Sequence, residues 1–148
     1  EKGLYVYQGD IDDGLSDYRG NSFDYVILNQ TLHFTKRPKF VLAETMRICR
    51  NAIVSFPNLG YWKNRMHILC KGSMRGSNPF QQEWHNSNIH YLSIEDFREY
   101  CEMNDYPIKR ERHFSPARRP VASHTVKIWA NFYAEFAFFV LDGEKFTE

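Results

Sequence analysis

Short runs of apolar residues, each ended by residues that favour turns, predict the strands of this chain. Residues 23–28 (Phe-Asp-Tyr-Val-Ile-Leu) and 52–56 (Ala-Ile-Val-Ser-Phe) are two such runs, and residues 134–141 include an uninterrupted Phe-Ala-Phe-Phe-Val-Leu. Apolar side chains on both faces are typical of strands in the interior of a sheet. We therefore expect these three strands at buried positions, with a short strand at residues 4–7 and a charged outer strand at 106–114.

After the first buried strand, apolar residues recur at helical spacing. Leu42, Met46 and Cys49 form one stripe of a helix predicted over residues 37–49, in which Pro38 suits the first turn. The buried strand, this helix and the next buried strand form a βαβ unit. The pattern therefore predicts an α/β fold with parallel strands.

Two further helices are predicted in the second half of the chain. Trp62, Met66 and Leu69 have the same spacing within a helix that we expect to end at Gly72. Ser93 is typical of a helix N-cap, since an acidic residue follows three positions later. The apolar residues of that last helix, on one face, are Ile94, Phe97 and Cys101.

Polar residues follow the first buried strand directly at its carboxyl end, where the sequence reads Asn29, Gln30 and Thr31. In open α/β sheets, ligands bind in the crevice beyond the carboxyl ends of the strands. The sequence therefore predicts a binding site at this point.

The composition argues against several classes of function. The 148 residues have the length of one domain, and 19 basic against 18 acidic residues give a net charge of +1. This balance, without any reader motif, predicts no nucleic-acid binding and no attraction to an anionic membrane. Cys49, Cys70 and Cys101 are too widely spaced for a zinc site or a disulfide framework, so we expect buried thiols in a cytoplasmic protein.

Several stretches together resemble one known family. They are residues 8–12 (Gln-Gly-Asp-Ile-Asp), 21–32, 52–58 (ending in Phe-Pro-Asn), 60–62 (Gly-Tyr-Trp), 88–90 (Asn-Ile-His) and 131–137. By these stretches the chain resembles the MetW (methionine biosynthesis protein W) family of the class I S-adenosylmethionine-dependent methyltransferase superfamily.

The resemblance implies a Rossmann-like sheet of seven strands in the order 3-2-1-4-5-7-6, with strand 7 antiparallel. Residues 4–7, 23–28, 52–56, 106–114 and 134–141 would be strands 3, 4, 5, 6 and 7. Strands 1 and 2, with their Gly-rich turn and acidic residue for the cofactor, have no counterpart in the sequence. We therefore expect residues 1–148 to be the carboxyl-terminal portion of a single methyltransferase-like domain.

The resemblance also implies a cofactor, S-adenosylmethionine, and residues that would bind it. Asp10 and Ile11 match the loop that contacts adenine, the carboxylate accepting a hydrogen bond from the exocyclic amine. Asn29, Gln30 and Leu32 match the residues that line the methionine and sulfonium part.

Other residues allow both a functional and a structural interpretation. His33 could be a general base beside a methyl acceptor, or a structural histidine after a strand. An acceptor pocket could include Trp62, Trp84, His85, His90 and Tyr91, although Trp62, at helical spacing, could equally be a core residue. Asp12 and Asp13 are interpreted as capping residues rather than a catalytic pair.

Two functions follow from the resemblance as hypotheses. The first is methyl transfer from S-adenosylmethionine to a small molecule, in which the protein aligns the acceptor with the methyl group. The second is a non-catalytic accessory or regulatory subunit of homoserine O-acyltransferase (MetX) in methionine biosynthesis. A nicotinamide-dependent dehydrogenase shares the sheet type but has no support in the residues.

Overall fold

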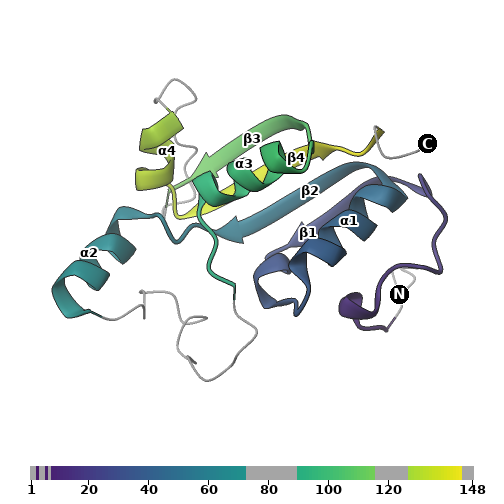
Figure 1. Cartoon of the computed structure of the whole chain (residues 1–148), viewed down its shortest axis with the longest axis horizontal. Coiled ribbons are helices and arrows are strands. Elements are labelled where there is room, and N and C mark those ends of the chain that lie inside the picture. Colours follow the sequence, from purple (N-terminus) through teal and green to yellow (C-terminus); the bar gives the residue numbers. More distant parts are fainter. Residues whose placement is uncertain (1–2, 4–5, 7, 73–89, 116–126, 145–148) are drawn as a thin grey trace.

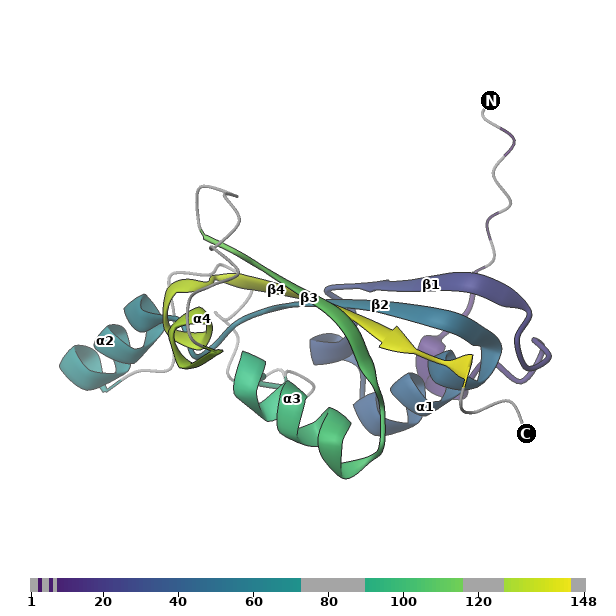
Figure 2. The same cartoon turned by 90° about the horizontal axis from the view of Figure 1, so that it is seen from above.

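The computed structural model describes residues 3, 6, 8–72, 90–115 and 127–144, which form one sheet with helices beside it (Figures 1 and 2). The strands are β1 (Phe23–Asn29), β2 (Cys49–Pro57), β3 (Ile108–Phe114) and β4 (Phe136–Asp142). The helices are α1 (Pro38–Ile48), α2 (Trp62–Lys71), α3 (Ile94–Met103) and α4 (Lys127–Tyr133), with the 3-10 turns η1 (Ile11–Asp13) and η2 (Leu32–Phe34).

The four strands lie in the order β1-β2-β4-β3. β1 and β2 are parallel, and β4 is antiparallel to both of its neighbours. This order corresponds to strands 4-5-7-6 of the expected sheet, so the α/β class and the interior position of residues 134–141 are confirmed. The strand expected at residues 4–7 lies, apart from Val6, outside the described residues.

Helices α1 and α3 pack on the same side of the sheet and enclose the core with it (Figure 2). The rings of Phe56, Phe97 and Phe139 meet there, with centroids 4.8–5.7 Å apart. The predicted apolar stripes are confirmed as buried, and they consist of Leu42 and Met46 on α1 and of Ile94, Phe97 and Cys101 on α3. Cys49, predicted as the third residue of the first stripe, is also buried, but it is the first residue of β2, because α1 ends at Ile48.

Three of the predicted helix ends are confirmed as well. Pro38 begins α1, where a missing amide hydrogen costs nothing. Ser93 and Asp96 form a reciprocal capping box at α3, since Ser93 Oγ accepts from the Asp96 amide and Asp96 Oδ2 accepts from the Ser93 amide. Gly72 ends α2 with φ 62°, a conformation that favours glycine.

The first buried strand is only half buried, which corrects the sequence-based expectation. On one face of β1, Leu28 is 3% exposed, but Tyr25 and Ile27 on the other face are 61% and 64% exposed. The reason is that the helices of the described part cover one side of the sheet (Figure 2). Within that part β1 also pairs with β2 alone, so it is an edge strand rather than an interior one.

Helix α2 also departs from its expected burial. Its stripe is on the surface, with Trp62 36%, Met66 46% and Leu69 78% exposed, so the interpretation of Trp62 as a core residue is wrong. The helix lies beyond the end of the sheet at which β2 finishes, away from the core between α1, α3 and the strands (Figure 1). Its buried residue is Asn64, whose Nδ2 donates to the Asn58 carbonyl.

The cysteines also differ in burial between the core and α2. Cys49 and Cys101 are buried, and burial raises the pKa of their thiols to about 11 and about 12. Cys70, on α2, is exposed, so the expectation of a buried thiol is wrong for this residue. In the described part of the chain, no helix has the length and apolarity needed to cross a bilayer.

Candidate functional site

Gln30, the residue after β1, has an unusual backbone conformation. Its φ is 52°, in the left-handed region, which costs a residue with a Cβ about 1–2 kcal/mol. Ser55 on β2 holds it there, because the Ser55 carbonyl and Oγ both accept from the Gln30 amide, at 3.0 and 3.1 Å. The same Oγ donates to Asn29 Oδ1 at 2.9 Å. Strain held in this way at a strand end is typical of functional positions.

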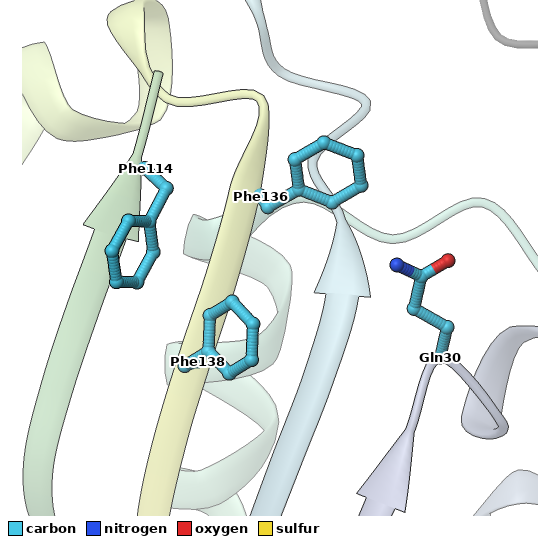
Figure 3. A pocket seen from close by; sticks show the side chains of 4 residues that line it. All are labelled: Gln30, Phe114, Phe136 and Phe138. Carbon is cyan, nitrogen blue, oxygen red and sulfur yellow. The ribbon is translucent and has the colours of Figure 1, made fainter. Parts of the chain in front are cut away.

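The Gln30 side chain lines a cavity of about 360 Å³ on the open face of the sheet. Among the described residues the lining also includes Phe114, Phe136 and Phe138, and Figure 3 shows Gln30 at the end of β1 facing the rings that β3 and β4 contribute. One amide against three aromatic rings can hold an apolar group and orient it by a single hydrogen bond.

The turn η1 is fixed beside the start of α1. Asp10 Oδ1 accepts from the Asp12 amide at 3.0 Å, and Ile11 is half-buried against the core. The buried carboxylate of Asp12 accepts from the Lys36 and Arg37 amides, both at 2.9 Å. These bonds, that of Lys36 first, hold the pKa of Asp12 below its ordinary value. Asp12 thus accepts hydrogen bonds from backbone amides, as a capping residue does. These amides belong to a segment that is distant in the sequence.

A second cavity, of about 210 Å³, lies between α1 and α3. It brings together Leu32, predicted to bind the cofactor, and His33, the possible general base. His90 and Tyr91, predicted for the acceptor pocket, line it as well. The two segments are joined where the His90 amide donates to the His33 carbonyl at 2.8 Å. The rest of the lining is mainly apolar and consists of Pro38, Lys39, Leu42, Leu92, Phe97 and Tyr100.

His33 has the chemistry of a weak base in this cavity. Its side chain is 6% exposed and lies against Phe34, with ring centroids 4.0 Å apart. Burial lowers its pKa below 6.5, so the imidazole is neutral at pH 7. Nδ1 is buried without a hydrogen-bond partner among the described residues. A neutral imidazole in this setting can accept a proton.

The other predicted pocket residues lie elsewhere. Trp62, at the start of α2, lines neither of the two cavities. Trp84 and His85 fall outside the described residues.

Asn58 is a positioning residue that we did not single out from the sequence. Its Oδ1 accepts from the Gly60 and Ile94 amides, and its Nδ2 donates to the Asn131 and Ala134 carbonyls. It therefore ties the turn after β2 to the start of α3 and the end of α4. The signal in the sequence is the Pro57-Asn58 pair at the carboxyl end of a strand.

A close backbone approach supports the same turn. A Cβ on Gly60 would clash with the side-chain amide of Asn131, so any other residue would require that amide to move.

Comparison with known proteins adds a family and a fold. The sequence model of the family described as methionine biosynthesis protein MetW matches residues 1–141. The bifunctional methionine biosynthesis protein MetXA/MetW of Rhodopirellula baltica is 37% identical over 100 residues, which cover 66% of the chain and 16% of that relative.

Solved structures with a similar fold are methyltransferases. An S-adenosylmethionine-dependent methyltransferase of Thermotoga maritima superimposes with a TM-score of 0.63 at 14% identity, covering 95% of the chain and 64% of that protein. One from Archaeoglobus fulgidus gives 0.56 at 9% identity, covering 96% and 69%. At these identities the likeness shows the fold, which is that of class I methyltransferases. The chain spans less than two thirds of the Thermotoga protein and a small part of the Rhodopirellula one.

Proposed function

The chain belongs to the MetW family, and from that premise we propose that it forms part of a protein that binds S-adenosylmethionine and transfers its methyl group to a small molecule. The observation that carries the proposal is Gln30, whose strained backbone is held by Ser55 at the carboxyl end of β1 beside an aromatic cavity. Class I methyltransferases have the same fold, and ligands of open α/β sheets bind at this end.

The residues fit the cofactor in part. Asp10 would accept from the adenine amine, with Ile11 against the ring, on a turn that Asp12 ties to the start of α1. Asn29, Gln30 and Leu32 would line the methionine part. When bound, S-adenosylmethionine supplies an electrophilic methyl group. In this proposal, the residues of this chain bind S-adenosylmethionine, orient its methyl group and keep water away from that group.

In this proposal His33 accepts the proton that the acceptor loses. Its imidazole is neutral at pH 7 and lines the cavity that His90 and Tyr91 share. The cavity of about 210 Å³ suits a small, largely apolar acceptor.

We further propose that the chain is the carboxyl-terminal portion of one methyltransferase-like domain. The support is the open face of the sheet, where Tyr25 and Ile27 are more than half exposed and Phe138 is 36% exposed. Apolar side chains of this kind are typically covered, and among the described residues no strand pairs with the outer edge of β1, which leaves room for a further strand. Strands 1 and 2 with their helices would cover both, in a cytoplasmic protein.

The proposed methyl transfer is tested by His33→Ala. In a version of the protein extended upstream, we expect methyl transfer to fall at least a hundredfold, because the general base is lost, while calorimetric affinity for S-adenosylmethionine changes less than twofold. His67→Ala, on α2, is the control. Equal loss of affinity and turnover would contradict the role of His33 as a base.

The alternative is an accessory or regulatory subunit of homoserine O-acyltransferase. The observation that favours it is the Rhodopirellula relative, whose name joins MetXA and MetW in one protein. In this case the cofactor site would sense S-adenosylmethionine, and His33→Ala would alter neither association nor the activity of the acyltransferase.

A further inference from the structure

The end of the molecule beyond the sheet exposes large apolar side chains on two helices. On α2 these are Trp62, Met66 and Leu69, and on α4 they are Trp129 and Tyr133, which are 48% and 47% exposed. We call these five residues the α2–α4 surface. Figure 1 shows both helices at the same end of the sheet.

The two helices meet through Arg65. Its Nε donates to the Gly60 carbonyl at 2.7 Å, and its guanidinium carbon lies 5.8 Å from the centroid of the Phe132 ring. Arg65, Trp129 and Phe132 also line one cavity of about 310 Å³. Trp129 stacks on Tyr133 with ring centroids 5.8 Å apart. Arg65 therefore links α2 to α4 beside this surface.

The charged residues of the two helices themselves are all basic. Helix α2 contains Lys63, Arg65 and Lys71 and no acidic residue, and α4 contains no acidic residue either. The acidic residue nearest to it in the Arg65 cavity is Glu95, which already accepts from Arg98 at 3.1 Å. The chain as a whole is almost neutral, so the basic excess is local.

We propose that the α2–α4 surface is the docking site for a homoserine O-acyltransferase, which meets it with an apolar patch bordered by acidic residues. The inference rests on the accessory function proposed above. Trp, Tyr, Met and Arg are enriched in the centres of protein interfaces, and complementary charge sets the orientation of the partners. The Rhodopirellula relative joins the two activities in its name, which identifies the partner class. A second copy of this chain fits less well, because two basic surfaces would repel each other.

The test is a titration of the full chain against the homoserine O-acyltransferase of the same organism. The double variant Met66→Glu with Leu69→Glu should bind at least about tenfold more weakly, because it places charge at the centre of the interface. Met103→Glu, on α3, where the side chain is about as exposed as that of Leu69, should bind within about twofold of wild type. The charge reversal Lys63→Glu with Lys71→Glu should weaken binding and flatten its salt dependence.

The outcomes separate the inference from the function on which it rests. Absence of binding by the wild-type chain would overturn the accessory function itself. Binding that tolerates all α2 changes would overturn the docking site and leave the association standing. Self-association that α2 variants abolish, or α2-dependent binding to phosphatidylserine vesicles without any effect on the acyltransferase, would also overturn it.

Discussion

The two faces of the sheet are built from the same kinds of residue but have opposite surroundings. On the face covered by α1 and α3, Leu28, Val54 and Phe139 are at most 3% exposed. On the open face, Tyr25, Ile27 and Phe138 are 61%, 64% and 36% exposed. The apolar pattern of β1 and β4 therefore indicates that both faces of the sheet suit burial. The described residues bury only one of these faces.

Helices α1 and α2 repeat this lesson. Both were predicted from apolar residues at helical spacing, yet α1 buries Leu42 and Met46, whereas α2 exposes its whole stripe. Spacing indicates that a stripe exists, and the neighbours decide whether it is buried. An exposed stripe is thus a surface that requires an explanation of its own.

Truncation of one phenylalanine on each face should give the largest difference in stability between the two faces. Phe139→Ala should lower the free energy of unfolding by about 3–5 kcal/mol, because it leaves a cavity between Phe56 and Phe97. Phe138→Ala should cost less than about 1 kcal/mol, because its ring is partly exposed. Urea unfolding measures both, and equal costs would contradict the division into a covered and an open face.

Acid should weaken the covered face specifically. The neighbouring His113, and Arg98 through two hydrogen bonds at 2.8 and 3.0 Å, lower the pKa of Glu111 to about 2. A lowered pKa in the folded state stabilises the protein above the ordinary value of 4.5, and this stability is lost as the pH falls toward 2.

The contribution of this carboxylate at neutral pH should be roughly 1–2 kcal/mol after allowance for solvent screening. Urea unfolding of wild type and Glu111→Gln between pH 2 and pH 7 checks it. The difference between the two proteins should shrink below pH 4.5. A difference that stays constant with pH would show that the ion pair between α3 and β3 does not contribute to the loss of stability in acid.

Gln30→Gly tests the role of the strained residue at the edge of the open face. Glycine adopts positive φ without steric cost, so the free energy of unfolding should rise by about 0.5–1 kcal/mol. S-adenosylmethionine binding by the complete protein should weaken, since the amide is lost. Asn21→Gly, at a position of similar φ, is the control, and should leave binding unchanged.

Ile27→Lys should have the smallest effect in the chain itself. Because Ile27 is 64% exposed, the free energy of unfolding should change by less than about 0.5 kcal/mol. In a version extended upstream, where we propose that this face is covered, the same change should cost several kcal/mol, since it buries a charge. Equal effects in both versions would contradict the proposed covering.

The sequence predicted those features that depend on local pattern. The capping box at Ser93, the stripe of α1 and the interior position of residues 134–141 are examples, since each follows from a few neighbouring residues. Exposure of Tyr25, Leu69 and Cys70 could not be read in this way, because it depends on which elements pack nearby.

The candidate site divides similarly. The pattern of a buried strand followed by polar residues marked Asn29 and Gln30, but not the φ of Gln30, which Ser55 imposes from the next strand. A capping role for Asp12 was expected, whereas its bonds to the amides of residues 36 and 37 join segments far apart in the chain. The four hydrogen bonds of the Asn58 side chain likewise exist only in the folded state.

The most direct test of the central claim is calorimetric titration of S-adenosylmethionine into this chain and into a version extended upstream. Our account predicts binding to the extended version alone, because this chain offers only the part of the site at Asp10, Ile11, Asn29, Gln30 and Leu32. Failure of the extended version to bind would contradict the proposed cofactor site. Equal binding by both versions would contradict the proposal that the site is shared with upstream residues.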